Sequence, residues 1–226
     1  MPRICVFDVN ETLLDLSALD PDFQRIFGAP GVRREWFKQV LQSSMVATMT
    51  GAYADFAAIG AAALEMTAAR HGLTLADDDK QSILGGMRRL PPHPDVREGL
   101  ERLRAAGLRL ATLTNSPPPV VDAQLANAGL RDYFEQVLSV DTVKRYKPAA
   151  EVYQMAARSL GVEIGQIRLI AAHDWDTTGA LRAGCAAAFV ARPGQTLDPL
   201  APRPDIVAND LLGVADLIIE REGTIH

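Results

Sequence analysis

The chain has 226 residues, a formal net charge of −5 and two cysteines. This length suits one large domain, or one domain that carries an inserted module. The acidic balance gives no general attraction to nucleic acid, and two cysteines cannot build a disulfide framework. The N-terminal residues are already strand-like, and no apolar run reaches the ~18 residues of a membrane span. We therefore expect a cytoplasmic protein that binds neither nucleic acid nor membranes.

The first apolar run, "ICVF" at residues 4–7, predicts a short buried strand that ends at Asp8. The composition then changes over residues 16–92, where β-branched residues become rare and apolar residues recur near helical spacing. This region contains three stretches that predict helices, at 32–50, 53–71 and 77–90. The prolines of "PPHP" at 91–94 cannot continue a helix, so they close the helical region.

After residue 94, predicted strands and helices alternate along the chain. Strands are expected at 108–113, 136–140, 167–172, 187–191 and 206–207, and helices at 95–106, 118–128, 149–160, 177–183 and 211–220. Such alternation with short loops is typical of a parallel sheet with helices on both faces. We predict an α/β protein with a doubly wound, Rossmann-like sheet: a catalytic core from residues 1–15 and 93–226, and an all-helical cap from residues 16–92.

Reactive side chains gather where the predicted strands end. In chain order they are Asp8, Asn10 and Thr12, then Thr114 and Asn115, then Lys147, and finally His173 and Asp176. The carboxyl ends of parallel strands meet at one edge of a doubly wound sheet, and ligands bind there. The sequence therefore predicts an active site at this edge, beneath the helical segment.

Four strings carry a resemblance to a known family: "FDVNETLLD", "TLTNSPPP", "VDTVKRYKPAAEVY" and "AAHDWDTTGA". In this order, and with a helical segment after the first strand, they resemble the haloacid dehalogenase superfamily, and most of all its 2-haloacid dehalogenase branch. The resemblance covers essentially the whole chain. It implies hydrolysis of short 2-haloacids to 2-hydroxyacids through an aspartyl ester, with a small carboxylate substrate and with no metal or cofactor. Relatives are often homodimers.

The resemblance implies four catalytic roles. Asp8 is expected to be the nucleophile, since a carboxylate can displace a leaving group and form an ester that water later cleaves. Thr12 is expected to hydrogen-bond the nucleophile's loop. Lys147 is expected to hold Asp8 ionised, because a nearby ammonium lowers the pKa of a carboxylate. Asp176 is expected to position the hydrolytic water or to stabilise Lys147; its structural alternative is a cap for the helix at 177.

A second group is expected to bind the substrate. The backbone amides near Val9 and Asn10, with Thr114 and Asn115, would hold the carboxylate; Phe37 and Trp175 would wall the pocket; Tyr153 and His173 would lie close by. Alternatives stay open at this stage. Thr114 and Asn115 fit plain turn capping, Tyr153 fits packing inside a helix, and His173 fits either a pocket-lining hydrogen bonder or a group that titrates and handles water.

Two positions decide between chemistries. Superfamily phosphatases carry a second aspartate where this chain has Asn10, and an amide cannot donate or take the proton that a leaving alcohol needs. Their magnesium-binding aspartate in the fourth loop corresponds to Ala172. A magnesium-dependent phosphatase is therefore the weaker alternative.

Phe37 stands where characterised dehalogenases carry an arginine that attracts the leaving halide. A relative that opens the ring of azetidine-2-carboxylate needs no such arginine, so a hydrolase of that type is an alternative reading. Both readings predict the same ester between Asp8 and the α-carbon of a small carboxylate. A protein that binds ligands without catalysis is the remaining alternative.

Overall fold

A single sheet forms the centre of the computed structural model, which describes residues 3–222. Within these residues the sheet has six parallel strands in the order β3-β2-β1-β4-β5-β6. The strands are β1 (Ile4–Phe7), β2 (Leu110–Thr114), β3 (Gln136–Ser139), β4 (Ile167–Ala171), β5 (Ala186–Val190) and β6 (Ile206–Ala208). Every residue of β1, β2 and β4 is buried. Central strands covered on both faces read as continuous apolar runs, which is why no alternation marked them in the sequence.

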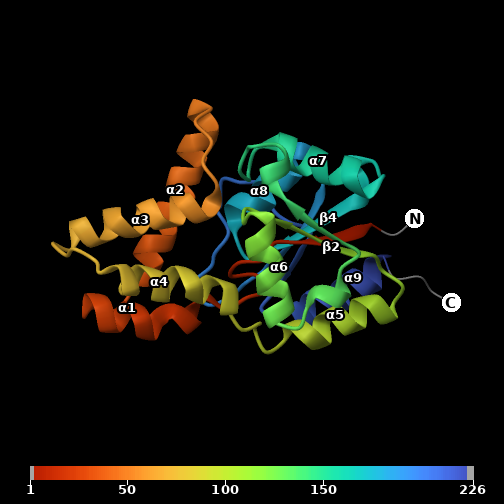
Figure 1. Ribbon diagram of the computed structural model, residues 1–226. Coiled ribbons are helices and arrows are strands. Elements are labelled where there is room, and N and C mark those ends of the chain that lie inside the picture. The colour runs from red at the N-terminus through yellow and green to blue at the C-terminus, as the bar shows by residue number, and fades with distance from the viewer. Residues whose placement is uncertain (1–2, 223–226) are drawn as a thin grey trace.

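Helices cover both faces of this sheet, as predicted for a doubly wound fold. They are α5 (Val96–Ala105), α6 (Pro118–Asn127), α7 (Ala150–Leu160), α8 (Asp174–Ala183) and α9 (Leu211–Glu222). Helix α5 packs on α9, and α7 packs on α8; Figure 1 shows these two pairs on opposite sides of the strands. No helix among the described residues is both long and apolar enough to cross a bilayer.

The remaining helices lie between β1 and α5 in the chain: α1 (Asp20–Phe27), α2 (Val32–Thr50), α3 (Phe56–Arg70) and α4 (Asp77–Gly86). They pack on one another and gather at one end of the sheet (Figure 1). Trp36 joins them, because its ring lies 5.4 Å from that of Phe23 and its Nε1 donates to Gly60 O at 2.9 Å. That residues 16–92 act as a separate cap stays a prediction. Residues 1–2 and 223–226 of the predicted core lie outside the described chain.

Most elements differ from the sequence prediction by one to four residues at an end, and the helices show three clear departures. Helix α1 and the 3-10 turn before it, Leu16–Leu19, were not expected; α1 buries only Phe23, so its apolar pattern is too sparse to read. The helix predicted to 90 ends at 86 and tightens into a 3-10 turn. Helix α8 begins at Asp174 instead of 177, with His173 at its N-cap, so the alternative of Asp176 as a cap is wrong.

Helix α8 approaches the start of α7 so closely that only glycine fits at position 179. A Cβ added there would lie 2.5 Å from Pro148 Cβ and 2.7 Å from the Tyr153 hydroxyl. We expect Gly179→Ala to destabilise the protein by about 1–3 kcal/mol, despite the helix propensity of alanine. Gly60→Ala is the matched control, since its Cβ would meet nothing nearer than 3.9 Å; it should stabilise by ~0.5–1 kcal/mol. Urea unfolding measures both changes, and equal effects would contradict the packing argument.

Candidate active site

The candidate site lies where the strand order of the sheet reverses, between β1 and β4. Asp8 follows β1 directly, and His173 follows β4 by two residues. The two loops are tied together at this point, because Asp8 N donates to Ile170 O at 3.0 Å. Doubly wound sheets open a crevice at such a switch point and bind their ligands in it.

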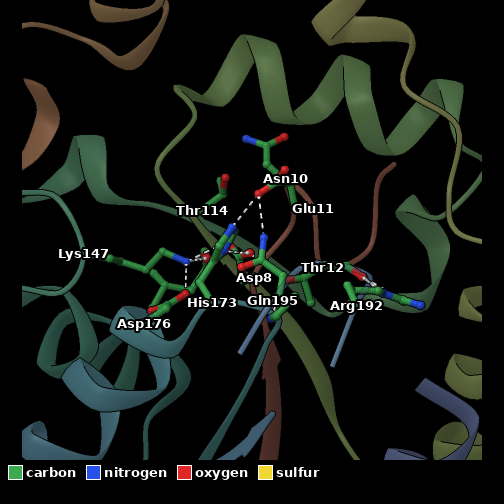
Figure 2. A network of polar contacts seen from close by, with 12 residues as sticks. Asp8, Asn10, Glu11, Thr12, Thr114, Lys147, His173, Asp176, Arg192 and Gln195 are labelled. Atoms are coloured by element: carbon green, nitrogen blue, oxygen red, sulfur yellow. Dashed lines mark hydrogen bonds and ion pairs between the residues drawn. The ribbon is translucent and has the colours of Figure 1, made fainter. Parts of the chain in front are cut away.

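Asp8 is held at both carboxylate oxygens. The Thr12 hydroxyl donates to Oδ2 at 2.6 Å, and Lys147 Nζ donates to Oδ1 at 2.8 Å (Figure 2). Thr12 is itself fixed, since its Oγ1 accepts a hydrogen bond from Ala172 N at 2.9 Å. The loop after β4 therefore orients the hydroxyl that orients Asp8. Thr12 does more than close a local turn, because it links two strand ends.

Lys147 is completely buried and its ammonium has three acceptors. Nζ donates to Asp8 Oδ1 at 2.8 Å, to Asp176 Oδ2 at 2.5 Å and to Leu113 O at 3.0 Å. An ammonium has three protons, so all of its donors are used. Asp176 is held from behind, because the Tyr153 hydroxyl donates to Asp176 Oδ1 at 2.6 Å. Lys147 is therefore a buried member of this group of charges.

The charges of this group decide which side chains are ionised. Burial raises the pKa of Asp8, but Lys147 and His173 outweigh burial and hold the pKa below its ordinary value. Burial lowers the pKa of Lys147, yet Asp176 and Asp8 raise it above its usual range. Asp176 has a raised pKa, because burial and the charge of Asp8 oppose its ionisation. Asp8 is therefore a carboxylate, and Lys147 an ammonium, at neutral pH.

His173 lies over Asp8 and is 4% exposed. Its Nδ1 is 3.4 Å from Asp8 Oδ2, a distance typical of an ion pair, and its Nε2 is 2.8 Å from Glu11 Oε2. Burial lowers the pKa of His173, but Asp8 and Glu11 raise it to about 9. The imidazole is thus a cation in the physiological range. The sequence raised titration of His173 as one alternative, and it did not single out Glu11.

Aromatic rings flank His173 and form part of a cavity. Its ring stacks on Trp175 at 5.0 Å and lies 6.4 Å from Phe37. These three residues line a cavity of about 490 Å³ together with Glu11 and Arg33. Phe37 also borders a more apolar cavity of about 480 Å³ between α2, α3, α4 and α6. Asp8, at 5% exposed, lies on neither lining; it sits directly beneath His173.

The other predicted binding residues lie around this centre. Asn115 Oδ1 accepts from Lys147 N at 3.2 Å, and Thr114 Oγ1 accepts from Ser116 N at 3.1 Å. Val9 is fully buried. Tyr153 contacts Asp176 and borders neither cavity.

Asn10 has a structural reason to be an amide. Its Nδ2 donates to Ser116 Oγ at 3.2 Å, and its Oδ1 accepts from Gln124 Nε2 at 3.0 Å. Gln124 Nε2 also donates to Met87 O at 2.8 Å. The side chain of Asn10 therefore joins the loop after β1 to the loop after β2 and, through Gln124, to the end of the helical segment.

Sequence reasoning missed Arg192, which holds the backbone of the loop after β1. Its Nε and Nη2 donate to Thr12 O at 3.2 and 2.9 Å, and its Nη1 binds both oxygens of Asp95. Asp95 in turn accepts from Leu211 N at the start of α9. Arg192 lies far along the chain after β5, in a segment with no motif, so no local pattern pointed to it.

Metal chemistry was not expected from the sequence. Within residues 3–222, no three or more His, Cys, Asp or Glu side chains are arranged to hold a metal ion. Both oxygens of Asp8 already have protein donors in Thr12 and Lys147. The absence of a metal and a cofactor stays a prediction.

The sheet order, the buried aspartate after β1 and the lysine that it shares with Asp176 are the features expected from the resemblance to a family of hydrolases. The sequence model of the haloacid dehalogenase-like hydrolases matches residues 2–184, and the chain belongs to this family. It is 32% identical to an (S)-2-haloacid dehalogenase from Pseudomonas sp. (strain YL), over 93% of this chain and 92% of the relative. It is also 27% identical to haloacetate dehalogenase H-2 from Moraxella sp. (strain B), over 94% of this chain and 96% of that one.

The fold agrees with solved structures over nearly the full length. The L-2-haloacid dehalogenase from Xanthobacter autotrophicus, with chloropropionic acid covalently bound, superimposes with a TM-score of 0.89 at 27% identity. The match covers 96% of this chain and 98% of that one. The predicted fold and family membership are thereby confirmed.

Removing the shared ammonium should cost stability in a pH-dependent way. Lys147→Met leaves Asp176 buried without a cationic partner and leaves Asp8 with His173 as its cation, and we expect a loss of about 3–5 kcal/mol at pH 8. In this variant the folded-state pKa of Asp176 lies above the unfolded value near 4. The folded protein then binds more protons than the unfolded chain, so stability falls as pH rises and the loss is smaller at pH 5.

Urea unfolding at pH 5 and pH 8 measures this difference against the wild type. Lys80→Met is the matched control, because Lys80 forms an ion pair with Glu65 on the surface. It should change stability little at either pH. A loss for Lys147→Met that is the same at both pH values would contradict the burial of an unpaired carboxyl group at Asp176.

Proposed function

We propose that this protein hydrolyses short-chain 2-haloacids to 2-hydroxyacids through an ester on Asp8, without a metal ion. The observation that carries the proposal is the state of Asp8: an ionised carboxylate, buried beneath aromatic side chains and held by Lys147 and Thr12. The names of the relatives support the same substrate class. A relative that holds chloropropionic acid covalently supports a covalent route.

In the first step, an oxygen of Asp8 attacks the α-carbon of the substrate with inversion, and the halide leaves with the electrons of its bond to carbon. The buried carboxylate is a better nucleophile than one in water because it has fewer donors to shed. Thr114, Asn115 and the backbone amides near Val9 and Asn10 hold the substrate carboxylate. Phe37 and Trp175 contact the alkyl part and exclude water.

In the second step, water attacks the carbonyl carbon of the ester and restores Asp8. Lys147 stays beside the oxygens that become negative in this step, so its charge stabilises them. Asp176 is positioned by Lys147 and Tyr153 and directs the water. The bond that breaks joins the Asp8 carbonyl carbon to the ester oxygen that is attached to the α-carbon. That oxygen leaves with the product, and one oxygen from water stays in Asp8.

Two alternatives have different support. Asn10 is committed to Ser116 and Gln124, which speaks against the proton transfer of a magnesium-dependent phosphatase. Opening of an azetidine-2-carboxylate ring uses the same attack by Asp8, and Phe37 on the cavity wall accommodates it equally well. The dehalogenase reading is favoured because the relatives above carry that activity in their names. A homodimer, a cytoplasmic location and a cap domain formed by residues 16–92 are proposed alongside.

Asp8→Asn should abolish turnover of 2-chloropropionate while leaving the fold intact, since an amide is a poor nucleophile of the same shape. Halide release measures turnover, and circular dichroism measures the fold. Full activity in this variant would contradict the assignment of the nucleophile.

Turnover in H₂¹⁸O tests the route independently. Wild-type protein should incorporate ¹⁸O into the peptide that contains Asp8 over many cycles, as mass spectrometry detects. Label found only in the product would contradict the ester. Assays of p-nitrophenyl phosphate, with magnesium and with EDTA, serve as the comparison, and we expect no phosphate release in either.

A further inference from the structure

Glu11 and His173 form a couple that the steps above do not use. The imidazole lies between two carboxylates: Nε2 is 2.8 Å from Glu11 Oε2, and Nδ1 is 3.4 Å from Asp8 Oδ2 (Figure 2). Nδ1 is buried and has no hydrogen-bond partner among residues 3–222. The ring is therefore anchored at one nitrogen, and the other lies 3.4 Å from an oxygen of the nucleophile without donating a hydrogen bond to it. Buried polar atoms without partners are rare and point to a function.

Glu11 is placed for this contact. Its backbone has φ 63°, in the left-handed region that non-glycine residues seldom adopt. Such conformations persist where surrounding contacts enforce them, and they gather at functional sites. Glu11 is fixed from two further directions, because Gln195 Nε2 donates to Oε2 at 3.3 Å and Arg33 Nη1 lies 3.5 Å from Oε1.

The charges around His173 favour the protonated ring. Asp8 and Glu11 are the carboxylates in direct contact, and they outweigh burial to raise the pKa of His173 to about 9. Lys147 and Arg33 weaken this effect of the two carboxylates, because Lys147 forms an ion pair with Asp8 and Arg33 forms one with Glu11. Further charged or titratable groups line the same cavity: Asp15, Arg34, Lys38, His93, Asp174 and Arg192.

We propose that His173 donates a hydrogen bond, or a proton where the leaving atom is an amine, to the group that leaves the α-carbon, and that Glu11 is the positioning residue that keeps His173 charged and oriented. The proposal rests on the proposed function, because it concerns the same ester-forming step. It also supplies a cation at the reacting centre of a chain whose cap-helix position 37 is a phenylalanine. Charged donors stabilise a leaving anion more than neutral ones do.

The step balances for both kinds of leaving group. An Asp8 oxygen forms a bond to the α-carbon, and the electron pair of the broken bond goes to the leaving atom. A halide departs as an anion hydrogen-bonded to Nδ1–H, and the hydrolytic water later gives one proton to the product hydroxyl and the other to solvent. An amine leaving atom takes the Nδ1 proton, and the water that cleaves the ester returns a proton to the neutral imidazole.

The consequence is a substrate class that is wider than bromo and chloro acids. Fluoride and ring amines are basic leaving groups that accept strong hydrogen bonds, so they gain most from a charged donor. Bromide is a weak base and gains least. The geometry thus assigns to this site 2-substituted carboxylates whose leaving group needs a proton or a strong hydrogen bond, with 2-fluoro acids as the simplest members.

The first test compares leaving groups. The probes are 2-bromopropionate and 2-fluoropropionate, and kcat/KM is measured for the wild type and for His173→Gln. We expect the variant to lose about 100-fold or more with the fluoro acid, and under about tenfold with the bromo acid. An equal loss with both acids would overturn the role of proton donor, since a merely structural role lowers both rates alike.

The second test follows the charge on the ring, and it needs no turnover. NMR titration of the His173 imidazole, assigned by its loss in His173→Gln, should give a midpoint near pH 9 in the wild type. Glu11→Gln keeps the shape of the side chain and should lower this midpoint by about one pH unit or more. Glu35→Gln is the matched control, because Glu35 contacts His71 at the same 2.8 Å on the surface of the helical segment; it should leave His173 unchanged.

The two tests separate the proposals. If the wild type turns over none of the acids, the proposed function fails. The titration still tests whether Glu11 keeps His173 charged, because an unchanged His173 midpoint in Glu11→Gln would overturn that role. If turnover occurs, the alkaline limb of kcat/KM should lie near pH 9 and move to lower pH in Glu11→Gln. A limb that does not move overturns the positioning role of Glu11.

Discussion

A single buried ammonium supports the whole site. The side chain of Lys147 is fully buried, and its three protons go to Asp8, Asp176 and a backbone carbonyl. Without this cation, two carboxyl groups would be buried close together with only His173 beside Asp8 to balance their charge. With it, Asp8 is an ionised carboxylate, and Asp176 is fixed between Lys147 and Tyr153. The ends of three strands meet around this one charge.

The site is therefore a network that extends across the cleft between the sheet and the helical segment. Asn10 reaches Ser116 and Gln124, and Glu11 reaches both His173 and Arg33 on α2. Adjacent residues of one loop thus make contacts in opposite directions. The left-handed backbone at Glu11 turns its side chain toward His173 while the side chain of Asn10 points toward Ser116. The loop after β1 therefore connects the other loops of the site.

Much of this arrangement could be predicted from the sequence, because the main residues of the site directly follow predicted strands. Asp8, Thr12, Lys147 and Asp176 each follow a predicted strand, and the alternation of strands and helices brings strand ends to one edge. What the sequence could not give were contacts made across the chain. Glu11 was not singled out because its partner His173 lies 162 residues away, and Arg192 lies 180 residues from the Thr12 carbonyl that it holds. The short helix α1 was missed because only Phe23 marks its buried face.

The Arg192 contacts connect the far end of the chain to the reaction centre. Arg192 joins the Thr12 carbonyl to Asp95, and Asp95 receives the first amide of α9. Helix α9 lines neither of the two cavities, yet through Asp95 and Arg192 it supports the loop that carries the nucleophile. Truncation of α9, or a weaker contact between α9 and α5, would therefore remove support from the Thr12 loop and displace the carboxylate of Asp8.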